Sequence, residues 1–320
     1  MKTAVISFTA AGGKLNDLIS GILLADSYKD AKNIYALTDN LMKEYDALIF
    51  IGAAGIAVRA IAPYIKSKDT DPAVIVCDEM GKFVIPVLSG HIGGANRLAC
   101  ELAEKINAQP VITTATDINK VWAVDSWASE NGFYIENIKN IKYISSALLR
   151  KESVGLDSDF KINGPLTENI SFGSFENGVV ISPFLKKTFK NTLNVVPKCI
   201  SLGIGCRKYT KLKSIEELFV KSGISPQAVR EISTVDIKKD ETALKEFAHK
   251  LGVPLNFYTA QELEMVEGDF SESEFVRKVA GVGNVCERAA AKGGGKLILK
   301  KITGDGVTLA AAIDDMEITF

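Results

Sequence analysis

Residues able to carry out acid–base chemistry gather in one short stretch of the chain, PVLSGHIGGANRLA at residues 86–99. It contains His91, one of only two histidines among 320 residues, with Ser89 before it and Gly93 and Gly94 after it. An imidazole can act as a general base on water, and exposed backbone amides beside it can hold a developing oxyanion. The stretch therefore predicts a hydrolytic site, with a histidine that only caps a helix as the competing interpretation.

A helix must follow this stretch and position it. Apolar residues recur at the intervals of one helix face, at Ala95, Leu98, Ala99, Leu102 and Ile106. The helix is therefore expected to begin near Gly93, with Asn96 and Arg97 in its first turns. Ser89 joins His91 in the predicted catalytic set as a hydrogen-bonding group, because the G-x-S-x-G pattern of a serine nucleophile is absent.

A second candidate for ligand binding is IGAAGIAVR at residues 51–59, which follows a predicted strand. Gly52 and Gly55 would leave backbone N–H groups open to an anion at a helix N-terminus, and Arg59 could pair with a carboxylate. Glycines at such a turn often serve only close packing, so this interpretation stays open.

A third candidate is LGIGCRK at residues 202–208 in the C-terminal half. Gly203 and Gly205 predict a glycine-rich turn after a strand, and Arg207 and Lys208 would make it a binding turn for carboxylate or phosphate. A tight turn with solvated charges is the simpler alternative.

The elements expected around these motifs divide the chain into three parts. Over residues 1–120, short apolar runs alternate with helical patterns at 15–24 and 56–65, which predicts an open, mostly parallel α/β sheet domain. The runs that predict strands are residues 3–8, 32–36, 46–51 and 73–77.

Residues 121–196 predict a small central α+β segment, with helical patterns at 121–131 and 138–151. Three short alternating runs in it favour a small antiparallel piece or a connecting domain, at residues 168–173, 178–182 and 192–196.

Residues 197–320 predict a second α/β domain. Two capping boxes are expected at 214–217 and 271–274, and Gly252 closes a helix over 240–251. A hairpin is expected from KLILKKI and VTLAAAI around the Asp305-Gly306 pair.

Composition excludes several classes of function. With 38 basic and 39 acidic residues, the net charge of −1 provides no footprint for nucleic acid or an anionic membrane. The five cysteines are odd in number and never spaced as C-x-x-C, so no disulfide framework or zinc site is indicated. No apolar run approaches the roughly 18 residues of a membrane span, and a cytoplasmic protein is expected. Nucleotide binding is disfavoured because no complete Walker or G-x-G-x-x-G motif occurs.

The N-terminal motifs together resemble the CbiG family, the cobalt-precorrin-5A hydrolases of anaerobic cobalamin biosynthesis. The resemblance is carried by IGAAGIAVRAIAPYIKSKDTDPAVIVCDEMGKFVIPVLSGHIGGANRLACELA at 51–103 and by PVITTATD at 110–117. SLGIGCRKYT, VAGVGNVCERAAA and GGGKLILKKITGDGVTLAAA resemble the family's C-terminal domain, which also occurs alone as CobE-type proteins. Tyr209, where the pattern leads us to expect glycine, and Cys286 depart from it.

The resemblance implies opening of a δ-lactone on a cobalt-corrinoid, with release of acetaldehyde. Cobalt would belong to the small-molecule substrate, and no resident metal or other cofactor is expected. His91 would be the base or proton shuttle, and the amides of Gly93 and Gly94 the oxyanion donors. Groups expected to position or bind the substrate are Gly52, Gly55, Arg59, Asn96, Arg97, Gly203, Gly205, Arg207 and Lys208.

Two alternatives accompany this implied function. Asp78 and Glu79 could form the acid–base pair, or a solvated turn. A non-catalytic corrinoid carrier of the same pathway is the competing activity. In either case the resemblance implies transient hand-over contacts with neighbouring pathway enzymes.

Overall fold

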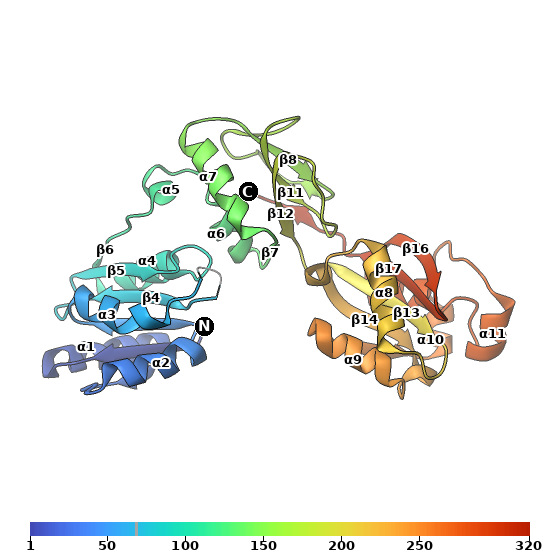
Figure 1. Ribbon diagram of the computed structural model, residues 1–320, viewed down its shortest axis with the longest axis horizontal. Helices are drawn as coiled ribbons and strands as arrows, with labels where there is room; N and C mark the ends of the chain where they lie inside the picture. The colour runs from blue at the N-terminus through green and yellow to red at the C-terminus, as the bar shows by residue number, and fades with distance from the viewer. Residues whose placement is uncertain (68–69) are drawn as a thin grey trace. The chain divides into compact units, whose positions relative to one another are not determined.

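The computed structural model describes residues 1–67 and 70–320, and Figure 1 labels its helices and strands along the chain. The chain divides into two compact units, Met1–Glu130 with Ser145–Glu152, and Asn131–Ile144 with Ser153–Phe320. The three-part division expected at residues 120 and 196 stays a prediction beside it. In the described part of the chain, no helix is long and apolar enough to cross a membrane.

A six-stranded sheet forms the centre of the first unit, in the order β2-β1-β3-β4-β5-β6. Its strands are β1 Thr3–Ser7, β2 Asp26–Tyr28, β3 Ala47–Ile51, β4 Ala73–Cys77, β5 Phe83–Leu88 and β6 Gln109–Pro110. Of these neighbouring pairs, only β4 with β5 is antiparallel. The prediction of an open, mostly parallel α/β sheet is therefore confirmed.

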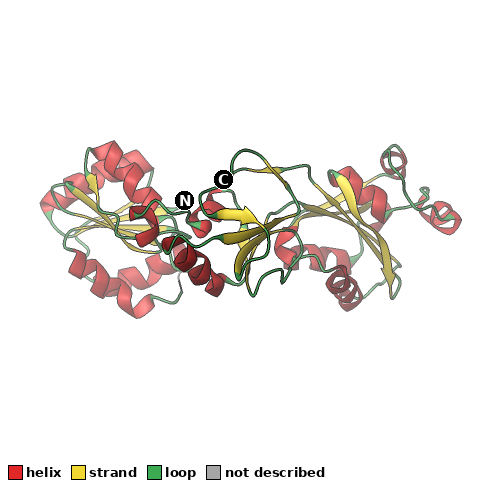
Figure 2. Ribbon diagram, turned by 90° about the horizontal axis from the view of Figure 1, so that it is seen from above, coloured by secondary structure: helices red, strands yellow, loops and turns green. Residues whose placement is uncertain are grey.

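Helices cover both faces of this sheet (Figure 2). The helices are α1 Ala10–Leu23, α2 Ile34–Glu44, α3 Ala54–Ile61 followed by the 3-10 turn η1 Ala62–Tyr64, and α4 Ala95–Ile106. Because successive strand residues point to opposite faces, Ile49 packs with Leu102 of α4 on one face and Phe50 packs with Leu41 of α2 on the other. The buried face of α4 thereby confirms the helix expected after the histidine stretch.

The strand predicted at residues 32–36 is wrong, because helix α2 begins there. Asn33 caps this helix by accepting a hydrogen bond from the Ala36 N–H through its side chain. Thr38 and Leu41 then form its buried face, a helical period that the short apolar run concealed. The second strand is instead the three-residue β2 at the sheet edge.

The middle of the chain contains α5 Ala115–Ile118, α6 Val124–Glu130, the 3-10 turn η2 Ile138–Asn140 and α7 Ile141–Leu149. A five-stranded sheet has the order β10-β8-β11-β12-β7, and β9 pairs in parallel with β18 to form a separate two-stranded sheet. The bounds are β7 Tyr134–Ile135, β8 Val154–Ser158, β9 Lys161–Ile162, β10 Ile170–Phe172, β11 Asn177–Ile181, β12 Asn191–Val196 and β18 Glu317–Ile318.

The antiparallel arrangement predicted for this middle sheet is wrong. Strands β10, β8, β11 and β12 run parallel to one another. Within this sheet only β7 is antiparallel to its neighbour, which is β12. Nearly every residue of β11 and β12 is buried, as in parallel strands covered on both faces, so polar alternation was a poor guide. Gly155 and Gly178 leave room for the ring of Phe189, which a Cβ at either position would approach within 2.4 Å.

The C-terminal sheet has the order β15-β14-β13-β17-β16. Its strands are β13 Ile200–Cys206, β14 Val229–Val235, β15 Leu255–Tyr258, β16 Lys296–Gly304 and β17 Val307–Ile313. The helices are α8 Leu212–Ser222, η3 Pro226–Ala228, η4 Asp236–Lys238, α9 Thr242–Leu251, α10 Ala260–Glu264, α11 Glu274–Ala280 and α12 Cys286–Gly293. The predicted β16–β17 hairpin is confirmed, and Asp305 and Gly306 both take the positive φ of its tight turn.

Both predicted capping boxes are wrong. Ser214 lies inside α8, buried, and its hydroxyl donates to Asp305. Ser271 lies before α11, which Ser273 caps, and the main-chain N–H of Ser271 donates to Glu287. The helix that has a capping box is α10, which begins after Thr259. The predicted closure of α9 by Gly252 is confirmed by a left-handed backbone at that residue.

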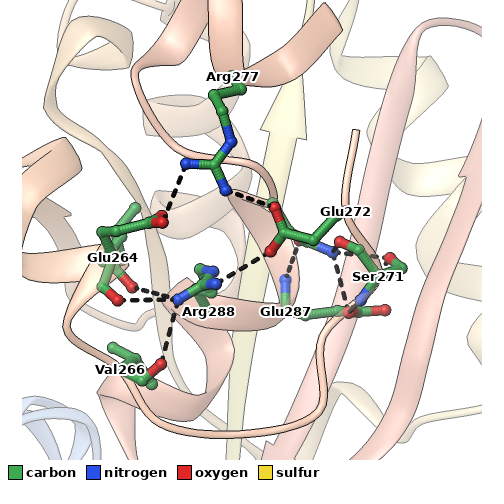
Figure 3. A network of polar contacts seen from close by, with 9 residues as sticks. Glu264, Val266, Ser271, Glu272, Arg277, Glu287 and Arg288 are labelled. Carbon is green, nitrogen blue, oxygen red and sulfur yellow. Dashed lines mark hydrogen bonds and ion pairs between the residues drawn. The ribbon is translucent and has the colours of Figure 1, made fainter. Parts of the chain in front are cut away.

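A polar network fastens the segment between α10 and α12 (Figure 3). The fully buried carboxylate of Glu287 accepts from the main-chain N–H groups of Ser271 at 2.8 Å and Lys301 at 2.7 Å. Arg288 donates to main-chain carbonyls at the end of α10 and to Glu272. A buried charge is stable only with such partners, so these groups hold the fold of the C-terminal sheet region.

We expect Gly203→Ala to destabilise the chain, because a Cβ there would lie 1.8 Å from the main-chain oxygen of Cys286 in α12. Overpacking of this kind costs about 1–3 kcal/mol or more. Differential scanning calorimetry of the full chain should show Tm lowered by at least about 2 °C. Gly21→Ala, in α1 with nothing within 4 Å of its added Cβ, is the control and should leave Tm equal or higher. An unchanged Tm for Gly203→Ala would contradict the packing described.

Candidate active site

His91 lies on a crowded loop, residues 89–94, between β5 and α4. Ser89 has a positive φ of 56°, and Gly94, the residue before α4, one of 80°. A Cβ on Gly93 would lie 2.4 Å from the Cβ of Ser89, and one on Gly90 would lie 2.8 Å from Oδ1 of Asn96. The glycines allow the loop to fold against itself, and this compact fold holds the His91 backbone in place.

Two carboxylates hold the His91 ring from opposite nitrogens. Its Nε2 lies 2.9 Å from Oδ2 of Asp117, which belongs to α5, and its Nδ1 lies 3.2 Å from the carboxylate of Asp125 in the first turn of α6. The side chain of Asp125 is 7% exposed, that of His91 14% and that of Asp117 37%. All three residues belong to the first compact unit.

These contacts raise the pKa of His91 from its ordinary value of 6.5 to about 9. The largest cause is the hydrogen bond to Asp125; burial opposes the charge, but the hydrogen bond to Asp117 and the charges of both carboxylates outweigh it. The imidazole therefore carries its proton at neutral pH. A general base must be unprotonated, so a pKa of about 9 disfavours His91 as the base, and that role stays a prediction.

Asn96 orients the more exposed carboxylate. Its Nδ2 donates to Oδ2 of Asp117 at 3.0 Å and to the hydroxyl of Thr114 at 2.9 Å, and its side chain is buried. The residue predicted to position substrate thus lies at the site, but its amide holds Asp117.

A cavity of about 410 Å³ opens beside these residues. Its lining includes His91, Asn96, Arg97 and Asp117, together with apolar side chains of which Ile112 is one. The guanidinium of Arg97 is about half exposed and lies 3.7 Å from Glu101. A cavity with a few convergent polar groups on an apolar wall is typical of a small-molecule site.

Ser89 and the amides near it are engaged in holding the loop. The hydroxyl of Ser89, which is buried, donates to the main-chain oxygen of Asp71 at 2.9 Å. The Gly94 N–H donates to the His91 carbonyl and the Ala95 N–H to the Ser89 carbonyl. The Gly94 N–H is thus occupied within the loop, and the oxyanion roles predicted for the Gly93 and Gly94 amides stay predictions.

The motif at Gly52, Gly55 and Arg59 is not brought into the cavity. The guanidinium of Arg59 folds back along α3 and lies 3.7 Å from where a Cβ of Gly55 would be. Gly52, with φ 149°, packs its backbone against the Phe8 ring. None of the three lines the cavity beside His91, so their binding roles stay predictions.

The C-terminal motif is part of a strand, which corrects the glycine-rich turn predicted there. Gly203 and Gly205 lie inside β13, where a Cβ on Gly205 would lie 2.6 Å from the Thr308 hydroxyl. The Arg207 N–H donates to Gly306 of the hairpin turn, and Lys208 follows it. Close packing thus explains both glycines, and the anion-binding role predicted for them stays a prediction. Tyr209 has a φ of 61°, which explains why glycine was expected there.

The alternative acid pair forms a turn. The carboxylate of Asp78 accepts hydrogen bonds from the main-chain N–H groups of Met80, Lys82 and Phe83 at 2.6–2.8 Å. Glu79 accepts from the Thr9 hydroxyl. Among residues 1–67 and 70–320, no group of three or more His, Cys, Asp or Glu side chains is arranged so that it could hold a metal ion.

Sequence reasoning missed Asp117 and Asp125. They stand 26 and 34 residues after His91, a separation that no local motif spans. Asp117 is the last residue of PVITTATD, a segment that carries the family resemblance, but no sequence pattern assigns this residue a role.

Three family models match the chain in succession. They describe the cobalamin synthesis G N-terminal region over residues 36–117, the cobalamin biosynthesis central region over 122–197, and the cobalamin synthesis G C-terminus over 200–312. These matches contain both the His91 loop and the Asp117 segment.

Two curated relatives are similar over most of their length. A cobalt-precorrin-5A hydrolase of Priestia megaterium is 34% identical over 88% of this chain and 82% of its own, and one of Salmonella typhimurium is 35% identical over 84% and 82%. Protein CobE of a Sinorhizobium species is 31% identical over 35% of this chain and 77% of its own. A crystal structure of a cobalamin biosynthesis protein G homolog from Sulfolobus solfataricus is 28% identical, with a TM-score of 0.43 over 98% of this chain and 97% of its own.

We expect Ser89→Ala to lower stability and to leave turnover within about threefold of the wild type. The lost hydroxyl leaves the buried Asp71 carbonyl without its donor, a loss of about 1 kcal/mol. Ser222→Ala is the control, because it removes a similar hydrogen bond from a serine hydroxyl to a main-chain carbonyl, that of Phe219. It shows how much stability the loss of one such bond costs. Turnover reduced a hundredfold in a folded Ser89→Ala protein would restore Ser89 to the catalytic set.

We expect nitrogen-15 NMR to show His91 titrating near pH 9, and a His249→Gln variant, in which His91 is the single remaining histidine, assigns its signals. Because the folded state binds this proton more tightly than the unfolded chain, the stability it contributes is complete below about pH 6.5 and is lost as pH rises through about 9. Asp125→Asn should move the His91 midpoint toward lower pH. An unmoved midpoint would contradict Asp125 as the main cause.

Proposed function

The chain belongs to the cobalamin synthesis G family of cobalt-precorrin-5A hydrolases, and from this premise we propose that it opens the δ-lactone of cobalt-precorrin-5A in the cavity beside His91. The observation that supports this location is an imidazole held between two carboxylates at a cavity wall, and these contacts raise its pKa to about 9. Lactone hydrolysis needs a group that takes a proton from water and a group that returns one to the leaving oxygen. The His91 cluster has both kinds of group.

The size of the cavity restricts how the substrate enters. About 410 Å³ is too small for a whole corrinoid with its side chains, so one edge of the macrocycle, with its lactone, would enter. The peripheral carboxylates that stay outside would meet cations, and Arg97 at the cavity is the nearest candidate. Arg59, Arg207 and Lys208 are further candidates.

Acetaldehyde release follows lactone opening in this proposal. Opening leaves a hydroxyl on the former bridge carbon; loss of its proton forms a carbonyl as the C–C bond to the macrocycle breaks. The macrocycle carbon takes up a proton, and the two-carbon fragment leaves as acetaldehyde. Cobalt remains with the substrate throughout, so the proposal needs no resident metal or other cofactor.

The setting is also part of the proposal. Five free cysteines and a net charge of −1 fit a reducing cytoplasm and a small-molecule substrate. Transient contacts with neighbouring enzymes would pass the corrinoid on without its release.

The test is a single turnover of cobalt-precorrin-5A followed by mass spectrometry and an acetaldehyde assay. The wild type should release acetaldehyde with the matching loss of mass. A non-catalytic corrinoid carrier, the alternative suggested by the CobE-like region, would bind the substrate and release none.

His91→Asn should lower this rate by about 10² or more, because the ring holds together the cluster that would transfer the protons. His249→Asn, at an exposed position of α9, is the matched control and should keep the wild-type rate. If His91→Asn stays within about threefold of the wild type, the cluster is not the reaction centre.

A further inference from the structure

We propose that Asp117 is the catalytic residue that takes the proton from the attacking water, and that His91 and Asp125 act behind it as positioning residues. This inference rests on the proposed function and assigns the reacting atom within that site. It follows from which atoms of the cluster are already engaged and which are open to the cavity.

Both nitrogens of His91 are engaged. Nδ1 faces Asp125 at 3.2 Å; Nε2 faces Asp117 at 2.9 Å and has the Thr116 hydroxyl 3.4 Å away. Since a protonated ring donates from both nitrogens, both carboxylates are acceptors of these bonds. His91 therefore has no free ring nitrogen with which to bind a water or a lactone.

Asp117 has one engaged oxygen and one open oxygen. Oδ2 accepts from His91 and from the Asn96 amide at 3.0 Å. No group in the described ranges 1–67 and 70–320 donates to Oδ1, and the side chain, more than a third exposed, lines the cavity. A carboxylate anchored through one oxygen presents the other in a fixed position, which is what proton transfer requires.

Asp125 supports this arrangement without reaching the substrate. It is nearly fully buried, and its Oδ1 also accepts from the main-chain N–H of Ser126. Its charge compensates that of the mostly buried imidazolium, which in turn faces Asp117. The other ionisable groups that line the cavity are Arg97, Cys100 and Glu130.

The proposed step balances in protons and bonds. Water attacks the lactone carbonyl carbon, and its proton passes to Oδ1 of Asp117 as the new C–O bond forms. The acyl C–O bond of the lactone then breaks, and the proton on Asp117 passes to the leaving alkoxide. The product is the hydroxy acid, and Asp117 returns to its ionised form while His91 stays protonated throughout.

The main experiment compares isosteric variants on cobalt-precorrin-5A. Asp117→Asn should lower single-turnover lactone opening by about 10²–10⁴, with substrate Kd within about threefold. Asp39→Asn, which replaces an exposed acid paired with Lys43 on α2, is the control and should keep the wild-type rate.

Asp125→Asn should stay measurably active. The alkaline limb of its pH–rate profile should move to a lower pH than the wild-type limb, which is expected near pH 9. A purely structural Asp125 would leave that limb in place.

Rescue separates base from scaffold. Added formate should raise the rate of the Asp117→Ala variant at least tenfold. Formate should leave the rate of the His91→Ala variant unchanged. Absence of rescue in a folded Asp117→Ala protein that still binds substrate would overturn the assignment of the base.

Labelling tests the step in the wild type, where folding is not in question. A single turnover in water enriched in oxygen-18 should place the label in the product carboxylate and none in the peptide that contains Asp117. Label in that peptide would make Asp117 a nucleophile and overturn this step. If the wild type releases no acetaldehyde, the proposed function fails; if it does and Asp117→Asn stays within threefold of the wild type, this inference alone fails.

Discussion

The row of hydrogen bonds from Asp125 through His91 to Asp117 is the interaction on which the reactive part of the molecule depends. An imidazole that is mostly buried would lose its proton without compensation, and two carboxylates more than compensate for that burial. The result is a cation fixed in place beside a half-exposed carboxylate. The proposed chemistry follows from this polarity, because the group with an open atom is the acid side chain and the histidine supports it.

Close packing explains three of the six glycines that first suggested binding, Gly93, Gly203 and Gly205. In the loop that carries His91, Gly90 and Gly93 have no room for a side chain because Asn96 and Ser89 lie against them. In β13, Gly203 has no room because α12 crosses it. The two kinds of glycine look the same in a sequence, since only the neighbouring backbone shows whether an open amide or a close contact is required.

The C-terminal sheet region uses its charges differently from the cavity. Glu287 and Arg288 are directed to main-chain groups and to Glu272, so their hydrogen-bonding capacity is spent within the fold. Asp117 keeps an oxygen open to a cavity. That contrast between engaged and open polar atoms, rather than charge alone, distinguishes the structural network from the proposed reaction centre.

The sequence by itself determined the parallel α/β sheet of the first unit, the helix after the histidine stretch and the β16–β17 hairpin, because apolar periodicity and turn residues are local properties. It also placed His91 at a helix N-terminus beside small residues. Only the tertiary structure decided that the pKa of this histidine is raised, since the cause is two carboxylates 26 and 34 residues away. It likewise decided the parallel direction of the middle strands and the packing role of Gly203, because strand direction and close contact depend on segments that no local pattern relates.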